Sequence, residues 1–408
     1  MSYNMEHYAS RLKPVEQLVL QGTSFCNLNC TYCDLSEESR RTKSKMHLDL
    51  VYKLLEQLIE QRLLAQELVV VWHSGEPLVL PPSYYEEAIE GILLFCKTRL
   101  PELSVKFDFQ TNATMINSTW CDLFEKYSNV VNIGVSCDGP MEFHNAFRID
   151  WKGRGTYERT LNGMEQLESR GIQYNLIAVV SKKTLANPKH FFDFFLDKRN
   201  AVTDFHFNIL ASPINTKEEL NYSEHDRAQY YEFYRELFEY WTKSDSVGES
   251  LPVRNFTQTL QRLASYGTPK APDFLKLSSA PLRSLNMDTL GNITTFYAGL
   301  DISTEIHRYG DNQGLGLGNI KDVTLKEMLS SPKLQRIIND FKRCQTSCES
   351  DCDYYTVCPG GFELLQLSKS KGKIIETETT ECVIHVKTLT DAVMDAIDSV
   401  GELDKSVG

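Results

Sequence analysis

The sequence predicts an α/β protein in which parallel βα units form a large N-terminal part and a smaller cysteine-rich part follows. Three observations predict this fold class. Short β-branched runs alternate with segments of helical spacing through the first half of the chain. This alternation stops near residue 240, and most of the cysteines gather in two clusters, one near each end. A chain of 408 residues is long enough for one large and one small domain.

Six candidate strands, each followed by a helical segment, make up the first half. Such units close into part of a (β/α) barrel or lie open as a doubly wound sheet, and the sequence pattern allows both. In either arrangement, ligands gather at the carboxyl ends of the strands. The candidate strands are 18–20, 68–72, 105–109, 131–135, 176–180 and 205–210. The candidate helices between them are 48–59, 83–96, 117–127, 156–170 and 187–198.

Beyond these units the pattern becomes irregular. We expect an aromatic-rich helix, a second helix after a polar stretch, a β-hairpin around a Gly-containing turn, two short helices and a final helix. These elements are expected at 230–241, 255–265, 285–297, 324–342 and 386–400. The Gly-rich stretch 311–318 lacks the strand and helix that flank a phosphate-binding loop, so we expect a plain loop there.

The composition is that of a soluble globular protein, with 41% hydrophobic and 24% charged residues. The net charge of -12 argues against a nucleic-acid enzyme, because a phosphate-binding surface normally carries a basic excess. The N-terminal residues show no basic-then-apolar signal pattern, and no stretch reaches the ~18 apolar residues that a membrane helix needs. We therefore expect a cytoplasmic protein that binds neither nucleic acid nor membrane.

Eleven cysteines are many for a cytoplasmic protein. Because that compartment is reducing, clustered cysteines indicate a metal site rather than disulfides. Three cysteines stand alone in apolar surroundings, where a free cysteine behaves as a small hydrophobic residue. These three are Cys96, Cys121 and Cys137.

The first cluster lies in the loop after the first candidate strand and reads Cys26-x3-Cys30-x-Tyr32-Cys33. Thiolates bind iron–sulfur clusters, and these short spacings let the sulfurs converge on one cube. Three ligands for four irons leave one iron open, and an open position separates a site that does chemistry from a closed structural site. The alternative is a structural zinc site in which His47 supplies the fourth ligand.

This spacing resembles the signature of the radical S-adenosylmethionine (SAM) superfamily, in which the aromatic residue at the position of Tyr32 lies near the adenine of SAM. The resemblance implies a partial (β/α)6 TIM-type barrel, which we expect over residues 14–240. It makes Cys26, Cys30 and Cys33 the catalytic ligands of a SAM-binding [4Fe–4S] cluster. In this family the open iron chelates SAM, and electron transfer from the cluster yields a 5'-deoxyadenosyl radical that abstracts a hydrogen atom.

Further segments at predicted strand ends match the same family. Ser74-Gly75-Glu76-Pro77 follows the second strand and looks like the Gly-Gly-Glu-Pro element that binds the methionine amino group of SAM. Ser74 departs from that pattern but keeps a small residue, and alone this stretch would also suit a tight turn. The resemblance implies further SAM contacts at the ends of later strands or just beyond them. These are Asn112, Ser136 and Arg148.

The second cluster is a run of cysteines near the C-terminus. It consists of Cys344, Cys348, Cys352, Cys358 and Cys382. A zinc ribbon would need two spaced pairs rather than this run. The arrangement resembles the SPASM or twitch extension of radical SAM peptide maturases. That resemblance implies a helical bridge over 241–280 and an auxiliary-cluster domain over 281–408.

The departures from a full SPASM domain, which has seven cysteines and two auxiliary clusters, are coherent. Phe362 stands where the family has a cysteine after Gly-Gly, and residues 294–299 hold none where the family has a pair. In the family these missing positions serve one auxiliary cluster. The resemblance therefore implies a single closed auxiliary [4Fe–4S] cluster, suited to electron transfer or structure. Its ligands would be Cys348, Cys352, Cys358 and Cys382, with Cys344 as an alternative to Cys348.

A narrower resemblance is to maturases that form three-residue cyclophanes. It rests on 291–296, 317–320, 378–382 and the run Cys-x3-Cys-x-Tyr-Tyr-x-x-Cys-Pro-Gly-Gly. It implies a ribosomally synthesised precursor peptide, hydrogen abstraction at a side-chain β-carbon, and a C–C bond from that carbon to a nearby aromatic ring. Ring closure releases one more electron and a proton, which gives the auxiliary cluster a task as electron acceptor. An electron donor such as flavodoxin or ferredoxin is also implied.

Three other functions stay open on the sequence. A sulfatase-type maturase that forms formylglycine would predict the full seven-cysteine extension. Thioether formation on a peptide cysteine is not excluded by the sequence, whereas a non-catalytic iron–sulfur carrier would leave the SAM elements unexplained. Only ~15 residues precede the first strand, so a leader peptide would add to a sheet edge or lie in a groove. Asp288, Asp301 and Glu305 are candidate proton acceptors or plain surface carboxylates.

Overall fold

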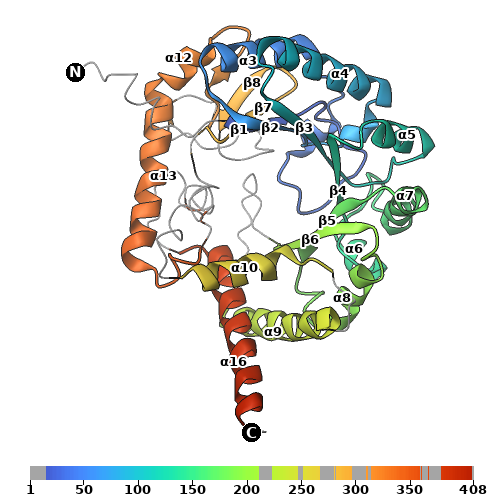
Figure 1. The fold of residues 1–408 in the computed structure, drawn as a ribbon, viewed down its shortest axis with the longest axis vertical. Coiled ribbons are helices and arrows are strands. Elements are labelled where there is room, and N and C mark those ends of the chain that lie inside the picture. Colours follow the sequence, from blue (N-terminus) through green and yellow to red (C-terminus); the bar gives the residue numbers. More distant parts are fainter. Residues whose placement is uncertain are drawn as a thin grey trace.

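A computed structural model shows an α/β partial barrel (Figure 1). It describes residues 15–210, 223–246, 251–266, 280, 282–295, 309–310, 314–358, 360, 366 and 378–406. Within these residues nine strands form one sheet, in the order β6-β5-β4-β3-β2-β1-β7-β8-β9. The pairs from β6 to β7 are parallel, whereas β7–β8 and β8–β9 are antiparallel. The predicted α/β class is confirmed.

The first six strands run in sequence order without a reversal. A doubly wound sheet reverses its strand order near the middle, so this order favours the barrel over the open alternative. The strands cover the predicted segments to within one residue and mostly begin a few residues earlier. They are β1 (Val15–Leu20), β2 (Leu64–Trp72), β3 (Ser104–Thr111), β4 (Val131–Ser136), β5 (Tyr174–Val180) and β6 (Val202–Ile209).

The helices between these strands form an outer layer around the sheet (Figure 1). The predicted helices are α3 (Leu48–Glu60), α4 (Pro82–Arg99), α5 (Ser118–Lys126), α7 (Tyr157–Ser169) and α8 (Pro188–Leu196). Three short elements were not predicted, because one turn is too short to show an apolar period. They are α2 (Glu37–Arg41), η1 (Pro77–Val79) and α6 (Met141–His144).

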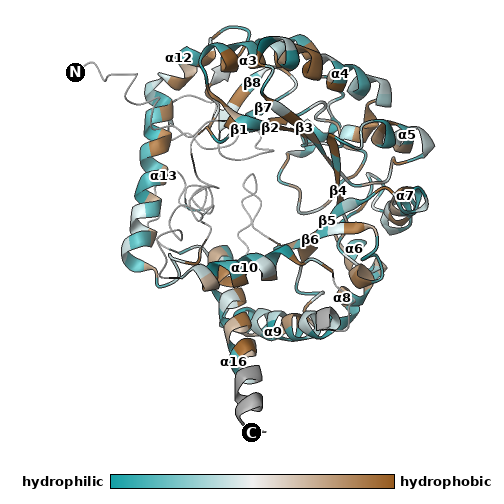
Figure 2. Ribbon diagram, viewed as in Figure 1, coloured by the Kyte–Doolittle hydropathy of each residue, from teal (hydrophilic) through white to brown (hydrophobic). Residues whose placement is uncertain are grey.

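The hydrophobic core lies between the sheet and this outer layer. In β5 every second residue from Tyr174 to Val180 is buried, and the residues between them are partly exposed. Figure 2 shows β3 and β4 mostly in brown, the hydrophobic end of its scale. Aromatic rings fill the space behind β6, where Phe195 and Phe205 stack with ring centroids 4.2 Å apart. Burial of each such ring contributes about 1.5–3 kcal/mol.

The C-terminal part joins the same sheet instead of forming a separate one. β7 (Ser284–Met287) pairs in parallel with β1, and β8 (Asn292–Thr295) returns as the predicted hairpin. The stretch expected as a plain loop ends in β9 (Gly318–Asn319), which pairs with β8. The division at residue 281 therefore crosses a continuous sheet, and the domain boundaries stay predictions.

Three helices follow β9 or lie near the C-terminus: α12 (Leu325–Leu329), α13 (Pro332–Asp351) and α16 (Leu389–Ser406). α13 is longer than predicted, because the polar residues that follow its apolar stripe include no helix breaker before its end. Two cysteines of the second cluster, Cys344 and Cys348, therefore lie on a helix. α9 (Glu224–Ser246) packs beside α16 (Figure 1). In the described part of the chain, no helix combines the length and the apolar character needed to cross a membrane.

Close packing of α7 on the loop after β3 gives a stability prediction. A Cβ atom added at Gly163 would lie 2.0 Å from the backbone oxygen of Ala113. Gly163→Ala should therefore lower the free energy of unfolding by about 1–3 kcal/mol, although alanine normally favours a helix. Gly91→Ala on α4 is the control, because its Cβ would meet the movable hydroxyl of Tyr52. Equal effects in urea unfolding would contradict this packing.

Candidate active site

A cavity of about 440 Å³ opens at the carboxyl ends of the barrel strands. Ten of the eleven residues predicted for the SAM-binding cluster and SAM line it, and Pro77 follows directly after Glu76. These ten are Cys26, Cys30, Tyr32, Cys33, Ser74, Gly75, Glu76, Asn112, Ser136 and Arg148. The residues come from four separate strand ends and from one following loop. The fold therefore brings these ten residues into one cavity, whereas the sequence shows only their order along the chain.

The loop after β1 presents the three cysteines, and a second loop holds it in place. Cys26, Cys30 and Cys33 are half-buried. The backbone of the cysteine loop donates hydrogen bonds to the carbonyls of residues 147 and 149, at 3.0 and 2.7 Å. The indole Nε1 of Trp151 donates to the Cys26 carbonyl at 2.9 Å. These contacts fix the direction in which the loop leaves the sheet.

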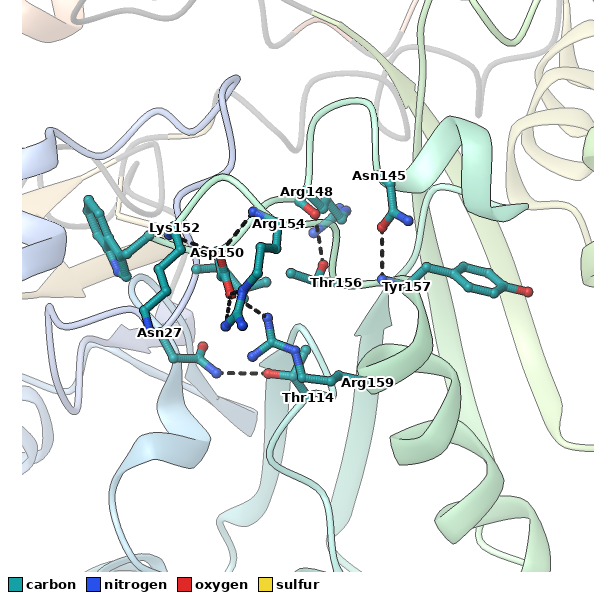
Figure 3. Close-up of polar contacts among 12 residues, drawn as sticks. Asn27, Thr114, Asn145, Arg148, Asp150, Lys152, Arg154, Thr156, Tyr157 and Arg159 are labelled. Atoms are coloured by element: carbon teal, nitrogen blue, oxygen red, sulfur yellow. Dashed lines mark hydrogen bonds and ion pairs between the residues drawn. The ribbon is translucent and has the colours of Figure 1, made fainter.

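The second loop, residues 145–157, is itself built around one carboxylate (Figure 3). Asp150 accepts hydrogen bonds from the backbone N–H groups of Lys152 and Arg154, at 2.9 and 3.0 Å. The guanidinium of Arg154 donates two more, at 2.9 and 2.7 Å, and Arg159 lies 3.4 Å away. Thr156 closes the loop by donating to the Arg148 carbonyl at 2.9 Å. The loop is therefore ordered by its own polar contacts.

The electrostatics of the cysteine loop fit an anionic iron–sulfur cluster. Burial raises the pKa of all three thiols, to about 11 for Cys30. The positive charges of Arg148 and Arg40 act in the opposite direction on Cys30 and Cys33. Iron must displace the thiol protons, and two nearby guanidinium groups offset the negative charge of the thiolates. The donor set and its surroundings therefore suit a cluster with three thiolate ligands.

The zinc alternative finds no support in the geometry. His47 is exposed, forms the N-cap of α3 and is not part of the cavity lining. Within the described residues, no three His, Cys, Asp or Glu side chains are gathered closely enough to hold a single metal ion. A four-iron cluster is a larger body than one ion and holds its thiolates farther apart.

The turn after β2 is pressed against the cysteine loop. Gly75 has a φ of +82°, and an added Cβ would lie 2.5 Å from the Thr23 carbonyl oxygen. Ser74, where the family pattern has glycine, also has a positive φ of 69°, and its hydroxyl bonds to His73 Nδ1 at 3.0 Å. The backbone N–H of Glu76 donates to the Phe25 carbonyl at 2.9 Å. Direct backbone contact therefore fixes the position of the turn relative to the cysteine loop.

Glu76 is buried, and most of its acceptor capacity is used by the protein. Its Oε1 accepts from the Thr111 hydroxyl at 2.6 Å and from the Leu78 N–H at 3.0 Å. Its Oε2 accepts from the Asn112 N–H at 2.8 Å. A carboxylate has about four acceptor sites, so one remains for a ligand. Burial raises the pKa of Glu76 to about 7, although these hydrogen bonds lower it.

Tyr32 and Arg148 share a partner that the sequence did not reveal. Asp138, which is only 2% exposed, accepts from the Tyr32 hydroxyl at 2.7 Å and lies 3.0 Å from Arg148 Nε. It also accepts from the Val179 N–H at 3.0 Å. The guanidinium lies 5.4 Å from the centre of the Tyr32 ring. Asp138 thus ties the cysteine loop, β5 and the Arg148 loop together.

Two other predicted residues differ in how free their side chains are. The Asn112 side chain donates to Asn27 at 2.9 Å and accepts from Thr114 at 2.6 and 3.0 Å, so it mainly joins loops. Ser136 lines the cavity at the end of β4 and is only half-buried. Its hydroxyl is therefore better placed than the Asn112 amide to meet a ligand.

Sequence reasoning missed two residues that reach the cavity from the C-terminal part. Glu381 and His385 lie on either side of Cys382 along the chain, and both line the cavity. Glu381 is in α15 (Thr380–Cys382) and is buried; His385 is in the π-helical segment η3 (Val383–Thr388). Glu381 is 348 positions from Cys33 along the chain, so no local pattern could have found either residue.

The second cysteine group is assembled from three elements. Cys348 lies on α13, Cys352 caps that helix, Cys358 lies in the next loop and Cys382 ends α15. Burial raises the pKa of the Cys358 thiol to about 12, and the charges of Cys382, Cys348 and Cys352 also raise it. The four predicted ligands therefore lie near one another. Cys344 is fully buried on α13, like the isolated Cys96, Cys121 and Cys137 elsewhere.

Of the three candidate proton acceptors, the structure describes only Asp288. Asp288 shapes the β7–β8 turn, since its Oδ1 accepts from the backbone N–H groups of Leu290 and Asn292, both at 2.9 Å. Its Oδ2 accepts from the Asn292 side chain at 2.7 Å. These hydrogen bonds give Asp288 a structural role in the turn. Asp301, Glu305 and Phe362 lie outside the described residues.

The sequence profile of the Radical SAM superfamily matches residues 20–195. This range runs from the end of β1 into α8 and contains the three cysteines, the Ser74–Pro77 turn and the Arg148 loop. Residues 20–195 form a radical SAM domain. The chain is thus a radical SAM enzyme, and the cavity at its strand ends is the candidate active site.

Two relatives of the radical SAM enzyme align over most of its length. The uncharacterized protein sll1766 of Synechocystis sp. is 29% identical over 397 residues, which are 97% of this chain and 94% of that protein. The cysteine-type anaerobic sulfatase-maturating enzyme of Clostridium novyi is 24% identical over 354 residues, which are 86% of this chain and 88% of that enzyme. The similarity therefore extends beyond the radical SAM domain.

Solved structures show the same fold. The structure of anSMEcpe with bound AdoMet has a TM-score of 0.72 at 21% identity and covers 95% of this chain and 96% of its own. Streptococcus suis SuiB bound to precursor peptide SuiA has a TM-score of 0.60 at 16% identity, covering 93% and 78%. The likeness includes the part beyond residue 195, so the C-terminal extension shares the architecture of these proteins.

The contact between the Ser74–Pro77 turn and the cysteine loop predicts that substitutions at Gly75 and Ser74 affect iron binding differently. Gly75→Ala should abolish iron binding by the first cysteine cluster, because the new Cβ would strike three carbonyl oxygens of the cysteine loop. Ser74→Gly should retain the iron and change stability by less than about 1 kcal/mol, since glycine tolerates the positive φ. Iron analysis after anaerobic reconstitution tests both variants. Full iron loading of Gly75→Ala would show that the loops are not in close contact.

The buried ion pair predicts a second difference, in stability. Asp138→Asn leaves Arg148 charged in the interior and should lower the free energy of unfolding by about 3–5 kcal/mol. Asp122→Asn is the matched control, because Asp122 pairs with Arg170 at the surface and its side chain is 64% exposed. That variant should lose less than about 1 kcal/mol. Similar losses for both in urea unfolding would contradict the burial of the first pair.

Proposed function

We propose that this radical SAM enzyme is a maturase that modifies a ribosomally synthesised precursor peptide. One observation carries the proposal: the cavity joins the three-cysteine loop to residues of the C-terminal segment that also bears Cys382. A substrate in this cavity would lie between the two cysteine groups. The relatives support a peptide substrate, since one is a sulfatase-maturating enzyme and SuiB was solved with its precursor peptide.

Each residue group has a proposed task in binding the cofactors. Cys26, Cys30 and Cys33 would hold a [4Fe–4S] cluster, and the cluster with SAM would supply a 5'-deoxyadenosyl radical. Glu76 would accept a hydrogen bond from the SAM amino group with its remaining acceptor site. The other proposed SAM contacts are Tyr32, Ser74, Gly75, Pro77, Asn112, Ser136 and Arg148. Arg148 is paired with Asp138, which fixes the position of its guanidinium at the cavity.

A single auxiliary [4Fe–4S] cluster is proposed for the second group. Cys348, Cys352, Cys358 and Cys382 supply four thiolates, which complete the protein ligands of a four-iron cluster. The charges of Cys382, Cys348 and Cys352 all act on Cys358, which supports this set of four ligands. A cluster closed by four protein ligands has no open iron for SAM, which suits it to electron transfer.

The reaction that we propose is a C–C crosslink between a side-chain β-carbon and an aromatic ring of the peptide. One hydrogen atom leaves the β-carbon for the 5'-deoxyadenosyl radical, and the carbon radical adds to the ring. The ring regains aromaticity by losing one proton and one electron. An auxiliary cluster held by the second cysteine group would accept this electron, so the peptide would lose two hydrogen atoms in all. A cytoplasmic flavodoxin or ferredoxin is the proposed donor for the first cluster.

Formylglycine formation is the second candidate, because sulfatase-maturating enzymes are among the relatives. That chemistry also starts with hydrogen abstraction at a β-carbon, of Cys or Ser. The hairpin residues Thr294 and Thr295, which stand near the family's missing cysteine pair, argue for one auxiliary cluster here. Thioether formation is a third outcome that the same experiment distinguishes.

Coexpression with any short open reading frame found beside the gene, followed by mass spectrometry of the peptide, tests the proposal. We expect a product lighter by two hydrogen atoms, with no backbone fragments between the linked residues. Deuterium placed on the β-carbon should appear in 5'-deoxyadenosine. The Cys26/Cys30/Cys33→Ala variant should leave the peptide unchanged.

Other products would decide between the alternatives. An aldehyde at one Cys or Ser, without a crosslink, would establish the sulfatase type of maturation. A link through a cysteine sulfur would establish thioether formation. A soluble, iron-loaded enzyme that releases no 5'-deoxyadenosine with the peptide would contradict the maturase proposal as a whole.

A further inference from the structure

Two cations that neither the SAM site nor the barrel explains lie beside the second cysteine group. Arg262 is on α10 (Arg254–Ser265), and Lys387 is in the π-helical segment η3. α10 packs against β6, and η3 follows directly after Cys382. The Lys387 side chain lies within hydrogen-bonding reach of Cys352, and the Arg262 guanidinium lies within electrostatic reach of Cys358, so the two cations approach the cysteines from different elements.

Arg262 is a half-buried cation without a carboxylate partner in the described part of the chain. Its Nε is buried and has no hydrogen-bond partner there, and its Nη2 donates to Gln258 at 3.0 Å. Burial lowers the pKa of Arg262, and the charge of the Cys358 thiolate opposes this effect. A guanidinium nevertheless stays protonated, and a buried charge needs an anion nearby. Within the described residues, the thiolates that the second cysteine group forms when iron displaces its protons are anions within electrostatic reach of Arg262.

Lys387 is also mostly buried, with 13% of its side chain exposed. Its ammonium lies 5.1 Å from the ring centre of Tyr354, which stands between Cys352 and Cys358 in the chain. It forms an ion pair with Glu378, whose side chain is 52% exposed. Burial lowers the pKa of Lys387, but Glu378 and the Cys352 thiolate raise it by more. Because water screens Glu378 more than Lys387, the pair adds positive charge on the cysteine side.

We propose that Arg262 and Lys387 raise the reduction potential of the auxiliary cluster, so that it accepts the electron released when the peptide ring regains aromaticity. This inference rests on the proposed function. Reduction adds one negative charge to the cluster, and nearby cations stabilise that state more than the oxidised one. Charge and solvent exposure are the usual protein controls on such potentials. The two residues act on the cluster by position and touch no substrate.

The midpoint potential of the auxiliary cluster tests this role directly. The full chain carrying Cys26/Cys30/Cys33→Ala isolates the auxiliary signal, which is followed by electron paramagnetic resonance during a redox titration. Adding Arg262→Gln or Lys387→Met should lower the potential, and adding both should lower it further. Glu378→Gln should shift it the other way. Arg262→Lys and Lys387→Arg, which keep the charge, should restore a potential near that of the parent.

A same-helix control separates charge from general disturbance. Arg254→Gln also removes a cation from α10, but that cation is paired with Asp204, so the potential should stay unchanged. Unchanged potentials in Arg262→Gln and Lys387→Met, with iron content retained, would overturn the inference and leave the proposed function standing. If Arg262→Gln does not hold iron, Lys387→Met and the charge-keeping variants decide. A parent protein without auxiliary iron would overturn both proposals.

Discussion

The architecture depends on the parallel pairing of β1 on both of its sides. β2 pairs along one edge of β1 and β7 along the other, so β1 lies inside the sheet. The loop that leaves its carboxyl end, which carries the first cysteine cluster, therefore starts from a fixed point. The same pairing attaches the C-terminal part, because β7 is the first strand of that part. One strand thus positions both halves of the candidate active site.

Polar contacts hold the loops that leave the carboxyl ends of the strands, where the hydrophobic core does not reach. Asp150 orders the loop that pairs with the cysteine loop, and Asp138 links Tyr32 to Arg148. Gly75 allows two backbones to touch where any side chain would separate them. These contacts join the loops that line the cavity, so the protein's own bonds fix the positions of the candidate SAM-binding residues. The cavity lies at the strand ends, as expected for a barrel of this class.

Much of this organisation was predictable from local pattern. Strands and helices of the barrel follow apolar periods of two and 3.6 residues, and the cysteine spacing lies within one loop. The partnership of Tyr32 with Asp138 joins residues 106 positions apart, and no short pattern encodes it. The arrival of Glu381 and His385 in the cavity depends on how η3 docks on β6, where His385 lies against Phe207 with ring centroids 6.5 Å apart. Tertiary packing alone decides such contacts. The extension of α13 through Cys348 is different: it follows from a polar run without a helix breaker, which carries no apolar period to mark it.

We propose that one chain holds a SAM-cleaving cluster and a single auxiliary cluster. Counting iron and sulfide per chain after anaerobic reconstitution tests it most directly. Two four-iron clusters predict about eight irons for the wild-type protein and about four for Cys26/Cys30/Cys33→Ala. About twelve irons would contradict a single auxiliary cluster, and a triple variant that keeps its full iron content would contradict Cys26, Cys30 and Cys33 as cluster ligands.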